Sequence, residues 1–110
     1  MITYSRFQAL LSDVADCASL EEYIAECGGS VPADSAEEAI RILSAIWTMA
    51  RDGLTIKSIA DACDLSMLSL CKRLDISRRT VGDWATGQRN PPAWQLPLIA
   101  YATVSLITHE

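Results

Sequence analysis

Two adjacent arginines, Arg78 and Arg79, stand at the expected start of a short helix in the stretch SRRTVGDWATGQRNPP, residues 77–92. A helix N-terminus favours anionic side chains, so this pair does not serve the stability of its own helix. A guanidinium group can donate two parallel hydrogen bonds to O6 and N7 of guanine. The pair therefore fits either an ordinary solvated helix end or a surface that binds a polyanion.

The charges of the chain are unevenly distributed around a net charge of −5. Residues 1–53 hold three basic and nine acidic side chains, a balance of −6, whereas residues 54–110 have a balance of +1 and residues 66–92 reach +3. An acidic total argues against nonspecific binding to nucleic acid, because attraction to phosphates supplies most of that affinity. The two arginines nevertheless lie in the one basic part of the chain.

The elements that must position these arginines are predicted to be helices. Apolar residues recur at helical spacing and no alternating strand pattern competes, so we expect an all-α protein that forms a compact helical bundle. The expected helices cover residues 4–18, 20–27, 36–52, 55–63, 66–74 and 77–85, with a last one from 92 or 93 to 107. We divide the chain into an acidic helical N-terminal segment, 1–53, and a second segment, 54–108.

Capping residues and helix breakers predict where the helices begin and end. Ser19 with Glu22, and Ser35 with Glu38, have the spacing of a capping box. Gly28-Gly29 and Gly53 supply the permissive backbone that ends the two helices so begun.

Three residues affect how the later helices are connected and where the last one begins. Asp64 and Asp75 stand where glycine would be commonest, and aspartate tolerates the left-handed conformation better than most residues. Pro97 removes one backbone hydrogen bond early in the last helix. That helix therefore either starts near Trp94 or bends at the proline.

The stretch SMLSLCKRLDISRRTVGDW, residues 66–84, has the apolar pattern of two short helices joined by a tight turn. Ser66 and Ser77 precede the two helices as N-caps. The inward positions would be Leu70, Cys71, Leu74, Ile76, Val81 and Trp84, all of them apolar. We predict a helix-turn-helix whose second helix, about residues 77–86, presents its N-terminal turn to base edges in the major groove.

A competing register begins eleven residues earlier, with TIKSIADACDL as the first helix and SMLSLCKRL as the second. It would turn Arg73 inward and offer Met67 and Leu68 to the bases. The later register fits the chemistry better, and the earlier one stays open as an alternative.

Residues 56–102 resemble the DNA-binding domain of the Xre/Cro phage-repressor family. The features that carry the resemblance are the serine-capped SMLSLCKRL, the ISRRTV joint, and Trp84 followed by Gly87, Arg89 and Pro91 before a final apolar helix. The resemblance implies a phage-repressor-like bundle, usually dimeric on double-stranded DNA, in transcription regulation of a phage or bacterial type.

Carried onto this sequence, the resemblance implies two sets of site residues. The candidate base readers are Ser77, Arg78, Arg79, Thr80 and Asp83, and the candidate contacts to the DNA backbone are Ser66, Lys72, Thr86, Gln88, Arg89 and Asn90. The chain departs from the family pattern at Met67, where a glutamine is common, and at Gly82 and Asp83 within the reading helix. These departures lower the expected affinity for DNA.

The remaining side chains that could react or bind a metal indicate no catalytic or metal-binding site. The four cysteines, Cys17, Cys27, Cys63 and Cys71, form no C-x-x-C pair, and the only histidine is His109. We expect small buried thiols, no metal site, no cofactor and no enzymatic activity. Trp84 and Trp94 are expected to pack in the core. Without a long apolar run or a secretion signal, the protein is expected to be cytoplasmic.

Two functions of different class follow. The first is a sequence-specific DNA-binding regulator whose N-terminal helices support a homodimer or sense an effector. The second is a protein-interaction module, antitoxin-like or inhibitor-like, that uses the acidic helices against a protein partner and binds DNA weakly or not at all.

Overall fold

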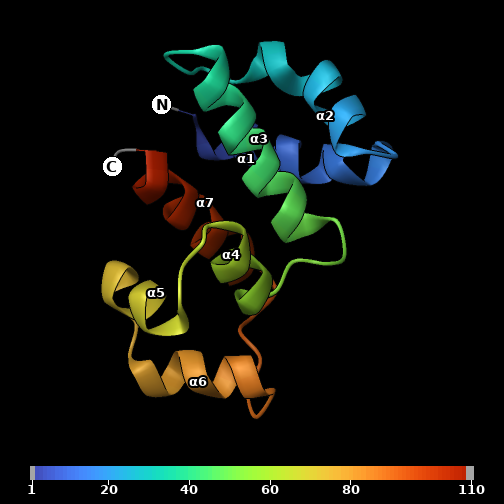
Figure 1. Cartoon of the computed structure of the whole chain (residues 1–110). Coiled ribbons are helices and arrows are strands. Elements are labelled where there is room, and N and C mark those ends of the chain that lie inside the picture. Colours follow the sequence, from blue (N-terminus) through green and yellow to red (C-terminus); the bar gives the residue numbers. More distant parts are fainter. Residues whose placement is uncertain (1, 109–110) are drawn as a thin grey trace.

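Seven α-helices make up most of residues 2–108, the part of the chain that this computed structural model describes. They are α1 (Tyr4–Asp13), α2 (Leu20–Cys27), α3 (Ala36–Ala50), α4 (Ile56–Ala62), α5 (Met67–Leu74), α6 (Arg78–Thr86) and α7 (Gln95–Thr108), with short 3₁₀ turns at Val14–Asp16 and Gly28–Ser30. No strand occurs in this range, so the all-α prediction is confirmed. In Figure 1, α1–α3 occupy one half and α4–α6 the other, with α7 running between them.

Serine side chains fix the starts of α2 and α3, as the sequence predicted. Ser19 Oγ accepts a hydrogen bond from the Glu22 N–H at 3.2 Å, and Ser35 Oγ accepts one from the Glu38 N–H at 3.1 Å. The Glu38 carboxylate bonds back to the N–H of Asp34, one residue earlier than a capping box requires. The caps are therefore present, with the reciprocal bond displaced by one residue.

The ends of the helices differ more from expectation. Helix α1 ends at Asp13 rather than near residue 18, because the chain tightens into a 3₁₀ turn before it reverses into α2. Gly28 has a right-handed φ of −57°, so α2 ends without the permissive glycine conformation that we expected there. Gly53 has a φ of +103°, so the chain leaves the helical conformation there after α3, as predicted.

Asp64 and Asp75 adopt the left-handed conformation that their positions predicted, with φ of 56° and 54°. They are the non-glycine residues with positive φ among residues 2–108. Such a residue costs roughly 1–2 kcal/mol in backbone strain. Both joints therefore reverse the chain sharply without glycine.

Helix α7 begins at Gln95, which places Pro97 in its first turn. The N–H groups of a first turn have no partner within the helix, so a proline there breaks no hydrogen bond. Of the two alternatives that Pro97 left open, the late start is the one that the chain adopts.

The main core draws on both halves of the chain. Phe7 of α1, Tyr23 of α2 and Leu43 of α3 are fully buried, and they share one cluster with Ile59 of α4 and Val104 of α7. The Tyr23 hydroxyl donates to the Leu10 carbonyl at 2.7 Å, and burial raises the pKa of this phenol. The segments 1–53 and 54–108 therefore share one packed interior.

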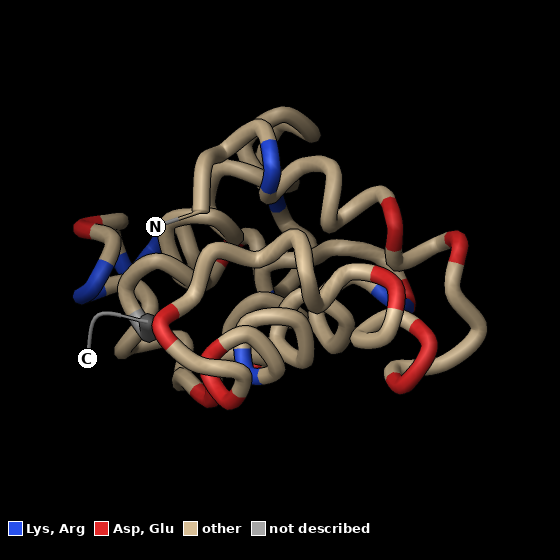
Figure 2. The backbone as a smooth tube through the Cα atoms, turned by 90° about the horizontal axis from the view of Figure 1, so that it is seen from above, with Lys and Arg blue, Asp and Glu red and all other residues tan. Residues whose placement is uncertain are grey.

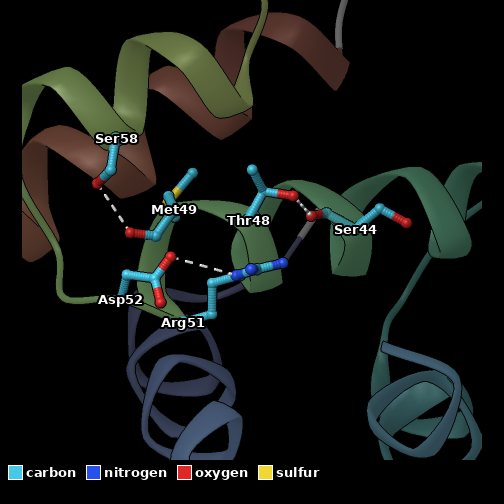
Figure 3. A network of polar contacts seen from close by, with 6 residues as sticks. All are labelled: Ser44, Thr48, Met49, Arg51, Asp52 and Ser58. Carbon is cyan, nitrogen blue, oxygen red and sulfur yellow. Dashed lines mark hydrogen bonds and ion pairs between the residues drawn. The ribbon is translucent and has the colours of Figure 1, made fainter. Parts of the chain in front are cut away.

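A polar joint ties α4 to the end of α3 (Figure 3). The Ser58 hydroxyl donates to the Met49 carbonyl at 2.8 Å. The same oxygen accepts from the Thr55 N–H at 2.9 Å. Nearby, Arg51 pairs with Asp52 at 3.3 Å at the surface. The Ser58 hydroxyl thus links the first turn of α4 to the last turn of α3.

The molecule is compact, with a Cα radius of gyration of 13.6 Å. A compact chain of this length is expected near 13 Å. Within residues 2–108, no helix has the length and apolarity needed to cross a bilayer.

Candidate nucleic-acid interface

Helices α5 and α6 are joined by the three residues Asp75, Ile76 and Ser77. The Ile76 N–H donates to the Cys71 carbonyl at 3.1 Å, which closes the end of α5 as the chain turns. The left-handed backbone of Asp75 makes this turn possible in so few residues. The short joint packs α6 against α5, and α6 also packs against α4.

A second, smaller cluster holds α4, α5 and α6 together. Leu70, Cys71 and Val81 are buried in it, and Leu74, Ile76 and Trp84 pack against it. These six are the inward positions that the sequence predicted, and all six meet in one place. Ile56 and Ala60 supply the surface of α4 that they cover.

Ser66 and Ser77 are the N-caps of α5 and α6, as predicted. Ser66 Oγ accepts from the Ser69 N–H and Ser77 Oγ accepts from the Thr80 N–H, both at 3.1 Å. The Ser77 hydroxyl also donates its proton to Thr80 Oγ1 at 2.7 Å. The half-buried Thr80 therefore keeps a hydroxyl proton that can still be donated outward.

Arg78 and Arg79 are the first two residues of α6, and both side chains are exposed. Neither forms an ion pair with a carboxylate in the described part of the chain. Figure 1 shows α6 along one edge of the molecule, on the far side of α4 from α1–α3. The guanidinium groups thus face solvent and are not covered by the acidic N-terminal segment, residues 1–53.

Thr86 and Gly87 close the C-terminal end of α6. The Thr86 hydroxyl donates to the Gly82 carbonyl at 3.0 Å, and Gly87 ends the helix with a φ of +82°. Asp83 is half-buried, and its backbone carbonyl accepts from the Arg89 N–H at 3.2 Å. This last bond folds the loop after α6 back against the helix.

The other predicted backbone contacts lie at the surface around α6. Gln88, Arg89 and Asn90 are exposed in the loop that follows α6, and Lys72 is exposed in the last turn of α5. Arg73 is exposed as well, although the competing register requires it to face inward. The burial pattern therefore favours the register in which α6 is the second helix.

One cation near this surface was not predicted. Lys57, in the first turn of α4, lines a hollow of about 560 Å³ together with Trp84, Thr86 and Asn90. Thr86 and Asn90 are two of the predicted backbone contacts. Lys57 lies far from both in the sequence, and no local pattern indicates that the start of α4 and the end of α6 line the same hollow.

The charges are unevenly distributed in space as well as in the sequence. In Figure 2, several basic positions lie at the left edge of the molecule, next to one acidic position, and other basic positions are scattered over the rest of the chain. Acidic positions lie mainly along the right and lower edges. The basic edge corresponds to the side of α5 and the start of α6 in Figure 1.

The four cysteines are free, with Cys27, Cys63 and Cys71 buried. Burial raises the pKa of Cys63 to about 11, and burial, followed by Glu22 and other nearby carboxylates, raises that of Cys17. Thiols with raised pKa are poor nucleophiles near neutral pH. Residues 2–108 bring together no group of three or more potential metal ligands, and His109 lies outside them.

The expectation for Trp94 is wrong. Trp84 packs against the smaller cluster, but Trp94 is 65% exposed and belongs to neither cluster. It stands in the turn before α7, where the Gln95 N–H bonds to the Pro92 carbonyl, so its side chain is not carried inward by a helix face.

Comparison with known proteins found no matching family model, curated protein or solved structure. The resemblance to the phage-repressor family therefore remains a prediction from the residues quoted above.

Proposed function

We propose that this protein is a sequence-specific DNA-binding regulator of transcription, with α6 as its reading helix in a phage-repressor-like helix-turn-helix. The observation that carries the proposal is the placement of Arg78 and Arg79. They are exposed, have no carboxylate partner among the described residues, and open a helix at the edge of the molecule. An α-helix of this kind fits the major groove, which is about 12 Å wide.

In this proposal the first turn of α6 reads bases. Arg78 and Arg79 each donate a bidentate pair to O6 and N7 of a guanine. The Thr80 hydroxyl donates to an acceptor on a neighbouring base, since its oxygen already accepts from Ser77. Asp83 accepts from a cytosine amino group, and because it is half-buried it contributes less than the arginines.

Contacts to phosphates set the register of α6 on the duplex. Lys72, Arg89 and Asn90 are exposed around the helix, and Lys57 lines the same hollow as Asn90. Each phosphate that a cation neutralises releases a counterion, so affinity falls as salt rises. The few cations and the net charge of −5 imply that one subunit binds weakly. Specific binding then requires two half-sites about one helical turn apart.

Selection from a random pool of duplex DNA tests the proposal. The purified wild-type protein is expected to enrich a two-fold symmetric site. A pool that stays random after repeated rounds at about 50 mM salt, where phosphate attraction is strong, would contradict it.

A protein-binding role is the second candidate, and the acidic surface of α2 and α3 favours it. Residues 1–53 carry a balance of −6, which suits a basic protein partner. The same selection separates the two, since this candidate predicts no enriched DNA site.

A further inference from the structure

We infer that the hollow beside Lys57 is a binding site for a small aromatic carboxylate. The hollow has a volume of about 560 Å³ and is lined by residues of α4, α6 and α7 and of the chain just before α4 and α7. Sites for small ligands typically have volumes of about 300–1,000 Å³, with mainly apolar walls and a few polar groups. The side chains of the walls indicate which class of ligand fits.

The apolar walls of the hollow are held by packing. Leu54 and Leu96 pack against the main core, and Trp84 packs against the smaller cluster of α4, α5 and α6. The Arg89 N–H bonds to the Asp83 carbonyl at 3.2 Å, which holds the loop after α6 in place as a further wall. Side chains fixed in this way form the hollow before a ligand arrives. An aromatic ring fits it, because the ring buries its faces and can stack on the indole of Trp84.

A single positive charge marks the polar part of the hollow. Among the described residues that line it, Lys57 alone carries a charge, and its ammonium forms no ion pair with a carboxylate of residues 2–108. Asn90 also lines the hollow, and its side-chain amide has no hydrogen-bond partner in the same range. An ammonium and an amide N–H can both donate to one carboxylate. The hollow therefore combines apolar walls with donors for a single anionic group.

The single ammonium favours a carboxylate over a phosphate monoester. A carboxylate carries one negative charge at neutral pH, whereas a phosphate monoester carries about 1.5–2. The excess charge would stay unpaired in a chain whose net charge is −5. Arginine is the side chain that suits bidentate binding of phosphate, and the described residues around this hollow include none.

Binding of such a ligand would oppose binding of DNA, a consequence that rests on the proposed function. In that function Lys57 contacts a phosphate, and Thr86 and Asn90, which line the same hollow, are candidate backbone contacts. A carboxylate on Lys57 neutralises the charge that attracts the phosphate, so the two ligands compete. By linkage, DNA lowers the affinity for the carboxylate by the same factor. The ligand would thus act as an effector that releases DNA.

Titration of the wild-type protein without DNA tests the site. The probe is 1-naphthaleneacetate, and its neutral amide, 1-naphthaleneacetamide, has the same ring without the charge. The carboxylate is expected to bind with a Kd on the order of 1 mM or tighter, and the amide several-fold more weakly. Backbone and indole N–H chemical shifts should change at Leu54, Trp84 and Leu96. The indole of Trp94, which is 65% exposed, should not respond and serves as the control for nonspecific stacking.

Three results of this titration would overturn the inference. They are the absence of binding, shifts confined to Trp94, and an amide that binds as tightly as the carboxylate. Tighter binding of 1-naphthyl phosphate than of the carboxylate would overturn the assigned ligand class.

Lys57→Gln removes the charge from an exposed position and keeps a polar side chain. It should bind the carboxylate about three- to tenfold more weakly, and the preference for the carboxylate over the amide should disappear. Lys72→Gln is the matched control, because Lys72 is exposed on α5 and does not line the hollow. Both variants should keep the circular dichroism of the wild type. If Lys57→Gln retains the preference, or Lys72→Gln loses it equally, the inference is wrong.

The selected duplex provides the last arm of the experiment. Saturating 1-naphthaleneacetate should lower the affinity of the wild type for this duplex by up to about tenfold and leave that of Lys57→Gln unchanged. An equal loss in both proteins, or no loss in the wild type, would overturn the competition with DNA. If selection enriches no duplex, the proposed function fails, whereas the titration without DNA still decides whether the hollow binds the carboxylate.

Discussion

The Ser77 hydroxyl accepts a hydrogen bond from the backbone N–H of Thr80, 3.1 Å away, and so fixes the residue at which α6 begins. Replacing an N-cap serine by alanine costs about 1 kcal/mol. Ser77→Ala should therefore lower the thermal midpoint by several degrees, as followed by circular dichroism. Ser77→Asn retains a capping oxygen and should unfold close to the wild type. Equal midpoints for all three proteins would show that this cap does not stabilise α6.

The turn before α6 depends on the left-handed backbone of Asp75, with φ 54° and ψ 36°. Glycine adopts this conformation without the strain of a Cβ atom, although it also gains entropy in the unfolded chain. Asp75→Gly should stabilise the protein by about 0.5–1 kcal/mol in urea unfolding. Asp75→Ala removes the same charge but keeps the Cβ atom, and it should not stabilise. A similar gain in both variants would point to the charge rather than to the backbone.

Local signals explain why most of the fold could be predicted. Ser19, Ser35, Ser66 and Ser77 each bond within the first turn of their own helix, so the four helix starts depend on residues close in sequence. The inward positions of α5 and α6 follow from helical periodicity in the same way.

Features that depend on distant parts of the chain were not predicted. The end of α1 is set by the reversal into α2, and the exposure of Trp94 depends on what packs around the start of α7. Lys57 lines the same hollow as Thr86 and Asn90 because α4 packs against α6. Sequence spacing contains none of these relationships. The sequence therefore predicted most of the candidate site residues but not Lys57.

The buried thiol of Cys63 should make stability depend on alkaline pH. Its pKa rises from the ordinary 9.0 to about 11, so the folded protein holds this proton more tightly than the unfolded chain does. The contribution is fully present below pH 9 and is lost as pH rises toward 11. Urea unfolding at about pH 8 and about pH 10 should give a lower free energy at the higher pH.

Cys63→Ala is the control for that measurement. The variant should be less stable at neutral pH because it leaves a small cavity, yet its stability should fall less steeply with pH. A decline identical to that of the wild type would assign the effect to other groups, such as Cys17, whose pKa is also raised.

Lys57 should act on DNA through phosphates if α6 is the reading helix. Lys57→Ala is expected to weaken binding to all duplexes alike and to reduce the slope of log affinity against log salt by about 1. Arg41→Ala removes one exposed charge from α3 and should leave the slope unchanged. If both variants lower the slope equally, net charge rather than a phosphate contact is responsible.

The central claim is that Arg78 and Arg79 read base edges, and the most direct measurement is the affinity of the double variant for the selected duplex. Arg78→Ala/Arg79→Ala should lose about ten- to a hundredfold in affinity for each arginine and keep its fold. Arg6→Ala/Arg41→Ala removes the same charge from exposed positions of α1 and α3 and should bind close to the wild type. An Arg78→Ala/Arg79→Ala protein that binds as tightly as the wild type, or no more weakly than this control, would contradict the account.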